Sequence, residues 1–186
     1  TSRARTADTP FHRWLRRLDH SRRMLFAPGD GLTLLIAVGI LLMPLFALSL
    51  AGWPLDLRTL IPVCLLSIGF GFLLSRSQYN ELFALILCAV YGTAFIGLIA
   101  AINEPGNLMD GVGSVLVRSA RWLVDAFSGG INQDELVFTL LVSGLFWLLG
   151  YNTSWHLFRM DRVWRVILPP GLILVINIIY YTGEAN

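Results

Sequence analysis

The sequence of 186 residues contains no lysine, only two cysteines and few charged residues of either sign. Charged residues make up 14% of the chain, against about 25% in a typical soluble domain. Cys64 and Cys88 lie in apolar surroundings, form no C-x-x-C motif and have no histidine beside them. They are therefore predicted to be buried thiols that pack as small apolar side chains. No arrangement of catalytic or metal-binding residues is recognisable, so no catalytic residue and no metal site is predicted.

Five apolar stretches without a charged residue dominate the chain. They cover residues 32–51, 59–74, 82–101, 136–155 and 166–181. A helix rises about 1.5 Å per residue, so about 20 residues cross the roughly 30 Å of hydrocarbon in a bilayer. The shorter second stretch can also cross if its polar ends reach the headgroups or the bilayer thins. The sequence predicts an all-α integral membrane protein with about five transmembrane helices and an amphipathic interfacial helix on each side.

All 14 basic residues are arginine, and they are distributed unevenly along the chain. Seven precede the first span, one lies between the second and third spans, and three lie between the fourth and fifth. Only three occur in the alternate loops. Because cytoplasmic loops of membrane proteins are enriched in basic residues, the N-terminus is predicted to lie in the cytoplasm. After five crossings, residues 184–186 are expected to begin an extracytoplasmic tail, and the location is expected to be the bacterial cytoplasmic (inner) membrane.

Residues 1–30 are predicted to form a cytoplasmic basic arm before the five-span membrane domain of residues 31–183. Thr9 and Pro10 are typical of a helix start, and apolar residues then recur at helical spacing opposite the arginines. Such a helix lies in the membrane interface and binds anionic lipid headgroups. Nucleic-acid binding is not predicted so close to a membrane span. The predicted headgroup-binding residues are Arg13, Arg16, Arg17, Arg22 and Arg23.

The longest loop contains the second amphipathic segment. Polar residues recur there at spacings of four, three and four, and they are Ser114, Arg118, Arg121 and Asp125. Apolar residues occupy much of the remaining helical surface. The pattern predicts one helix over residues 107–127 that lies along the outer membrane surface. Its polar face is predicted to be solvated, with substrate binding by Arg118 and Arg121 as the alternative.

Several residues within the spans are typical of helix packing. Small residues recur at every fourth position of the third span, and they are Ala89, Thr93, Gly97 and Ala101. Such a stripe allows close approach of another helix. Packing within the chain is the favoured interpretation, and docking of a separate subunit is the alternative. Trp147, in the middle of the fourth span, is predicted to pack against another helix. Asn152 and Asn177 are explained equally well by interhelical hydrogen bonds or by a ligand.

His156 lies at the predicted cytoplasmic end of the fourth span. A histidine in this position can be the axial ligand of a haem or of a magnesium porphyrin, but beside Trp155 it is more typical of the membrane interface. No cofactor is predicted, and pigment or haem contact is expected only through a partner complex. Proline interrupts three of the spans, as in some transporters, although no ionisable residue lies at mid-depth.

The fourth and fifth spans form the most distinctive part of the chain. They contain the segments LLGY (148–151), WHLFR (155–159), RVW (162–164), ILPPG (167–171) and VIN (175–177). This region resembles the N-terminal multispan membrane region of bacterial transglutaminase-like membrane proteins, especially the large ones of filamentous green bacteria. The resemblance covers the whole chain in layout and is specific over residues 135–181. Proteins of that family carry a Cys-His-Asp triad in an extracytoplasmic domain, and no residue of this chain matches it.

The resemblance implies a non-catalytic membrane anchor or scaffold. These residues are not expected to form an enzyme, although a transglutaminase-like domain could follow in a longer gene product. The alternative is an accessory structural subunit of a large respiratory or photosynthetic membrane complex, and a small-molecule transporter ranks third. The predicted partners are a lipid bilayer with anionic headgroups and other membrane protein subunits.

Overall fold

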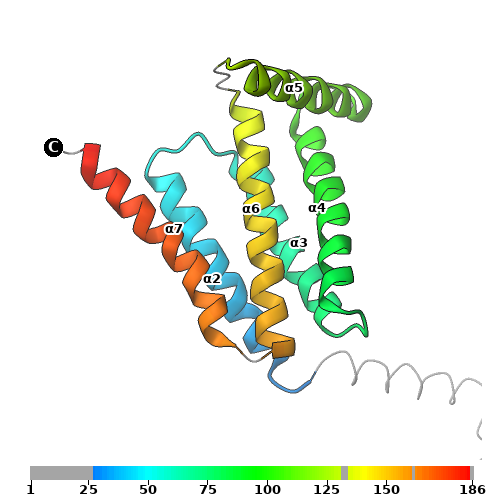
Figure 1. Cartoon of the computed structure of the whole chain (residues 1–186), viewed down its shortest axis with the longest axis vertical. Coiled ribbons are helices and arrows are strands. Elements are labelled where there is room, and N and C mark those ends of the chain that lie inside the picture. The colour runs from blue at the N-terminus through cyan, green and yellow to red at the C-terminus, as the bar shows by residue number, and fades with distance from the viewer. Residues whose placement is uncertain (1–26, 131–133, 161, 185–186) are drawn as a thin grey trace, which may run out of the picture. The chain divides into compact units, whose positions relative to one another are not determined.

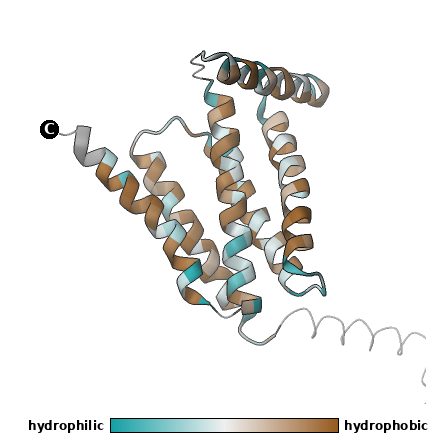
Figure 2. Ribbon diagram, in the orientation of Figure 1, coloured by the Kyte–Doolittle hydropathy of each residue, from teal (hydrophilic) through white to brown (hydrophobic). Residues whose placement is uncertain are grey.

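The computed structural model describes residues 27–130, 134–160 and 162–184. These ranges contain six α-helices, one π-helical turn and no strand. Five of the helices are long and apolar enough to cross a membrane, which confirms the predicted all-α membrane fold (Figures 1 and 2). The elements are α2 (Asp30–Leu50), α3 (Leu57–Ser75), α4 (Glu81–Asn103), α5 (Leu108–Ser128), α6 (Glu135–Trp155), η1 (His156–Met160) and α7 (Val163–Glu184).

Polar residues at the helix starts explain where the helices begin. The side chain of Asp56 accepts a hydrogen bond from a backbone N–H in the first turn of α3, and Asn80 and Asp134 do the same for α4 and α6. Such caps satisfy N–H groups that have no partner within the helix. The predicted spans and the predicted outer helix differ from the observed helices by at most three residues at either end. The predicted basic arm and the five arginines predicted to bind headgroups lie outside the described residues.

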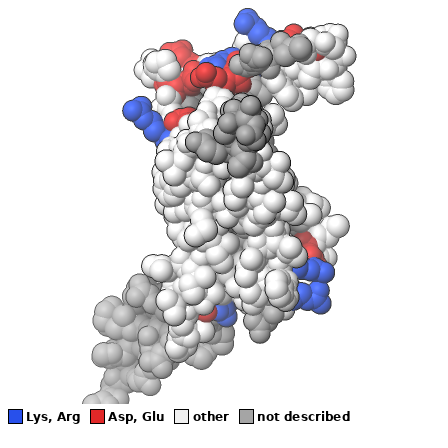
Figure 3. Space-filling view, turned by 90° about the vertical axis from the view of Figure 1, so that its left-hand side faces the viewer, with Lys and Arg blue, Asp and Glu red and all other residues white. Residues whose placement is uncertain are grey.

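The residues from Leu34 onward form one compact unit, in which α3 and α6 make the most extensive contact between helices. Helix α4 packs against both of them, and α5 lies across the ends of α4 and α6 (Figure 1). We call this end of the bundle the α5 end and the opposite end the η1 end. The charged side chains visible in Figure 3 gather at these two ends and leave an uncharged band between them. This distribution is the one that a bilayer requires of spanning helices.

Glycines allow α3 and α6 to approach each other closely. A Cβ atom at Gly71 of α3 would lie 2.9 Å from the backbone Cα of Tyr151, and a Cβ at Gly150 of α6 would overlap the side chain of Ser67. The Ser154 hydroxyl donates a 2.9 Å hydrogen bond to the backbone oxygen of Ile68 across the same contact. Close backbone approach and interhelical hydrogen bonds are the main sources of helix association in lipid.

Trp147 packs between helices, as predicted. Its side chain is 2% exposed, and its Nε1–H donates a 2.9 Å hydrogen bond to the backbone oxygen of Cys88. The indole lies against Gly92 of α4, where a Cβ atom would overlap it. The buried face of α4 is therefore formed by Ala84, Cys88, Gly92, Ile96 and Ala100.

The small-residue stripe of α4 packs only in part within the chain. Ala101 is buried, but Ala89 and Thr93 are exposed, and no atom lies within 4 Å of a Cβ built at Gly97. The prediction of intramolecular packing is wrong for these three residues. The predicted and observed faces both repeat every four residues and differ by one position. The Trp147 indole selects between them because it lies against Gly92, where there is no Cβ to overlap the ring, whereas the adjacent position on the predicted face is Thr93.

Candidate functional site

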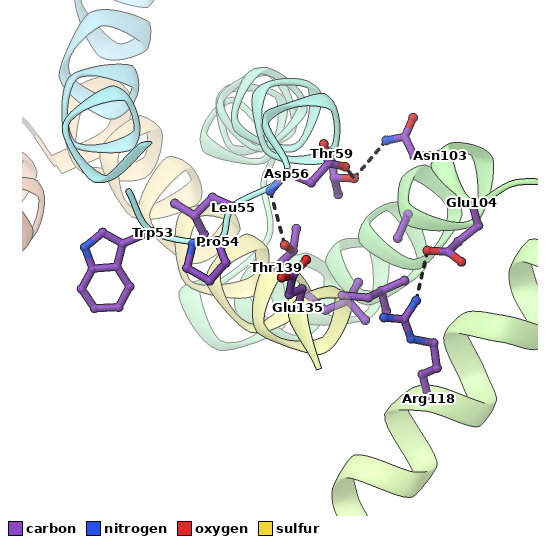
Figure 4. Close-up of a pocket in the computed structure, with 13 residues that line it drawn as sticks. Trp53, Pro54, Leu55, Asp56, Thr59, Asn103, Glu104, Arg118, Glu135 and Thr139 are labelled. Carbon is purple, nitrogen blue, oxygen red and sulfur yellow. Dashed lines mark hydrogen bonds and ion pairs between the residues drawn. The ribbon is translucent and has the colours of Figure 1, made fainter. Parts of the chain in front are cut away.

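A polar cleft of about 510 Å³ opens at the α5 end, between the ends of α3, α4 and α6. The loop before α3 forms one wall and Arg118 of α5 forms the other (Figure 4). Ala100, Leu136 and Leu140 supply apolar surface. The polar and charged residues that line the cleft are Asp56, Thr59, Asn103, Glu104, Arg118, Glu135 and Thr139.

Arg118, in the middle of α5, joins two helix ends at this cleft. Its Nε and Nη2 donate hydrogen bonds of 2.8 and 2.5 Å to the two carboxylate oxygens of Asp134, and its Nη1 lies 3.3 Å from Oε1 of Glu104. Glu104 also accepts a 3.2 Å hydrogen bond from the Ser114 hydroxyl. A bidentate pair of this kind is among the stronger polar contacts in proteins. It ties α5 to the C-terminus of α4 and to the N-terminus of α6.

The pKa values of the two partners shift in the directions that this contact predicts. The hydrogen bond from Arg118 is the main cause that lowers the pKa of the Asp134 carboxyl below its ordinary value. The same hydrogen bond raises the pKa of the Arg118 guanidinium. Both groups therefore stay charged across the physiological pH range, and the contact is a permanent ion pair rather than a proton-transfer site.

These contacts show what the polar face of α5 meets besides solvent. Ser114 and Arg118 are half-buried and bind carboxylates at the ends of neighbouring helices, whereas Arg121 is exposed. The helical spacing predicted a polar stripe correctly but could not show what the stripe faces. The signal in the sequence was the acidic residue at each end of the loop, Glu104 and Asp134.

A second set of hydrogen bonds surrounds the start of α3. The Thr59 hydroxyl donates to Asp56 at 2.7 Å and accepts from the Asn103 side-chain amide at 2.9 Å. The backbone N–H of Asp56 lies 3.4 Å from the Thr139 hydroxyl of α6. These bonds connect the starts of α3 and α6 to the end of α4, and Thr59 and Thr139 are both buried.

A hydroxyl next to a carboxylate can serve as a nucleophile and its base. Here, however, Asp56 is the N-cap of α3, and its other oxygen accepts the 3.0 Å hydrogen bond from the Arg58 N–H. Asp56 and Thr59 are therefore arranged as the N-cap of a helix and not as a base and a nucleophile. Among the described residues, no group of three or more His, Cys, Asp and Glu side chains could hold a metal ion. The exposed Glu135 is the charged residue of the cleft with the most freedom to contact another molecule.

The two intramembrane asparagines make interhelical hydrogen bonds, one of the two interpretations left open by the sequence. Asn177 of α7 donates to the backbone oxygen of Ala47 at 3.2 Å and accepts from the indole N–H of Trp53 at 3.1 Å. Asn152 of α6 donates to the backbone oxygen of Arg165 at 2.9 Å. These contacts attach α7 to α2 and α6. The outward surface of α7 is mostly apolar and exposed.

His156 is buried at the η1 end, where α6 passes into the π-helical turn. Its Nε2 lies 3.4 Å from Nη1 of Arg165, and its Nδ1 is enclosed without a hydrogen-bond partner in the described part of the chain. In this conformation a guanidinium lies beside one ring nitrogen and the other nitrogen is enclosed, so neither nitrogen faces an open space in which His156 could act as an axial ligand. Cys64 and Cys88 are free and buried within the apolar core.

The most important packing positions were not singled out by the sequence analysis. Gly71, Gly111 and Gly150 form close contacts between helices, as Gly92 does. A four-residue spacing of small residues, Ser67-x₃-Gly71-x₃-Ser75, was present on α3, but the same signal on α4 was equally strong.

Comparison with protein families, with curated proteins and with solved structures finds no match to this chain.

Proposed function

We propose that these residues act as a non-catalytic membrane anchor or scaffold, resembling the membrane region of bacterial transglutaminase-like proteins. The proposal rests on the observation that most charged groups in the cleft are bonded to other parts of the same chain. Asp56 caps the start of α3, Glu104 at the end of α4 accepts a hydrogen bond from Ser114 of α5, and Arg118 of α5 pairs with Asp134 at the start of α6. Groups held in this way stabilise a platform at the α5 end and have little capacity left for substrate.

The interior of the spans supports the same proposal over transport. Transporters and pumps usually place ionisable residues at mid-depth. In this chain the charged residues of the spanning helices lie at their ends, and Asn152 and Asn177 bond to neighbouring helices. The proline residues of α2, α3 and α7 lie within continuous helices rather than at breaks that could form a binding site.

The accessory-subunit alternative is favoured by the outward face of α4. Ala89 and Thr93 are exposed, and open space lies beside the half-buried Gly97, so the three form a strip of small residues along a spanning helix. Such a strip allows another helix to approach closely. An anchor and a subunit would both use this face. They differ in whether the native polypeptide contains a further domain. A longer polypeptide with a Cys-His-Asp domain would support the anchor, whereas a polypeptide of about this size within a stable complex would support the subunit.

We expect Gly97→Leu to release a partner while leaving the chain folded. The added side chain would hold the partner helix away from α4, and no atom of the described residues lies within 4 Å of its Cβ. Affinity purification from native membranes in mild detergent measures the loss, with Gly39→Leu on the outward face of α2 as the matched control. The proposal of association fails if wild-type protein purifies alone. It fails also if substituting Cys64, Cys88 and His156 together abolishes an activity while the assembly remains whole.

We further propose that the α5 end faces the extracytoplasmic side of a bacterial inner membrane. The uneven distribution of arginine supports this orientation. An impermeant thiol reagent applied to intact cells is expected to label Ser128→Cys at the end of α5 but not Ser77→Cys between α3 and α4. The background from Cys64 and Cys88 is low because both thiols are buried. The opposite labelling pattern would reverse the proposed topology.

A further inference from the structure

An apolar groove lies between α5 and the first turns of α6, and it shares one lining residue, Leu140, with the polar cleft. Its volume is about 450 Å³, and Ser119 and Trp122 are its least apolar lining residues. No charged side chain lines it. The apolar walls are formed by Leu116, Ala120 and Leu123 of α5 and by Val137, Leu140 and Leu141 of α6.

The groove continues into a row of exposed leucines on α6. Leu141, Leu145 and Leu148 are 53%, 49% and 47% exposed, and spacings of four and three place them on one face of the helix. Because α6 crosses the membrane, this row faces hydrocarbon. The wall of the groove is thus continuous with the lipid-facing surface of α6 and shares its apolar chemistry.

The length of this surface corresponds to one leaflet of a bilayer. From Val137 to Leu148 the helix rises about 16 Å, close to the roughly 15 Å that is half of the hydrocarbon thickness. Helix α5 covers the upper end of the row, at the level where α6 begins. An occupant of the groove is therefore enclosed near the membrane surface and exposed along the rest of its length.

We propose that an acyl chain of one phospholipid, from the leaflet at the α5 end, occupies this groove and extends along the leucine row of α6. The groove recognises the chain and not the headgroup, since it offers no charge to a phosphate or an amine. Trp122 lies at the groove wall on the interfacial helix, a depth that tryptophan prefers in membranes. The lipid completes the contact between α5 and α6.

Native mass spectrometry of the protein from mild detergent tests this proposal. Wild-type protein is expected to retain one phospholipid per chain, with phosphatidylcholine and phosphatidylglycerol retained equally. Ala120→Phe fills the groove and should reduce the retained lipid at least fivefold. Ala94→Phe makes the same change on the exposed surface of α4 and should leave it unchanged. Equal retention in both variants, strong headgroup preference, or a non-lipid occupant would overturn the proposal.

Fluorescence provides a second test that does not require the groove to be filled by a bulky substitution. The Trp122 signal is obtained as the difference between wild type and Trp122→Phe, in vesicles with increasing fractions of chain-brominated phosphatidylcholine. A bound chain should quench this signal with saturation at a low brominated fraction. Quenching in simple proportion to the bulk fraction would show that only ordinary boundary lipid contacts the groove, and would overturn the proposal.

Discussion

Replacing Gly92 with leucine is expected to destabilise the protein by about 3 kcal/mol and to lower its melting temperature in detergent by roughly 6–12 °C. Even a Cβ at this position would overlap the Trp147 indole. The indole cannot move away without losing its 2.9 Å hydrogen bond to the Cys88 backbone oxygen and opening the contact between α4 and α6. Thermal unfolding of the purified variant measures the loss.

Gly97→Leu is the matched control for this experiment. It makes the same exchange on the same helix, so the change in helix propensity is the same. At Gly97 no atom lies within 4 Å of the added Cβ, and the new side chain would face outward. A melting temperature near that of wild type is expected. An equal decrease in melting temperature in the two variants would contradict the observation that Gly92, and not Gly97, faces the bundle interior.

Gly111→Val is expected to detach α5 from the ends of the spanning helices. Gly111 lies against the backbone of Ala101, where a Cβ would overlap the carbonyl group. A backbone group cannot rotate aside as a flexible side chain can, so α5 itself must move. The amides of α5 should exchange with solvent about a hundredfold faster, corresponding to about 3 kcal/mol of lost local stability. Hydrogen exchange followed by mass spectrometry measures the effect helix by helix.

Gly113→Val, two residues further along α5, provides the comparison. No atom lies within 4 Å of a Cβ at Gly113, so this variant should keep α5 in place. In Gly111→Val the spanning helices should retain their protection, because their mutual contacts do not involve α5. Unchanged exchange of α5 in Gly111→Val would show that the ion pair of Arg118 alone is sufficient to hold this helix.

The positions of the spans could be predicted from the sequence because they depend on local properties. Hydropathy over about 20 residues and a polar residue at each helix start determine where a helix enters and leaves the membrane. Both signals depend only on residues that are close together in the sequence. The same holds for α5, whose amphipathic pattern was predicted to within one residue at each end.

Which side of each helix faces the bundle interior could not be predicted in the same way. In a soluble protein the apolar face of a helix points inward, but the lipid-facing side of a membrane helix is equally apolar. The stripe at Ala89 and Thr93 and the buried face at Cys88 and Gly92 therefore look alike in the sequence. The choice depends on Trp147, 54 residues or more further along the chain. The same limit applies to Arg118, because its partners become neighbours only when the ends of α4 and α6 meet.

Helix α3 begins one turn deeper than α6. The N–H of its cap residue Asp56 meets Thr139, the fifth residue of α6, so this carboxylate lies about 6 Å below Glu135. We expect water and headgroups to reach this carboxylate and to indent the bilayer over α3, while α4 and α6 span its full thickness. Such an indentation costs fractions of a kcal/mol for each Å of mismatch. Two proteins with adjacent indentations would share one deformation, so we expect membrane elasticity to favour neighbours beside α3 and to enrich this chain where the bilayer is thin.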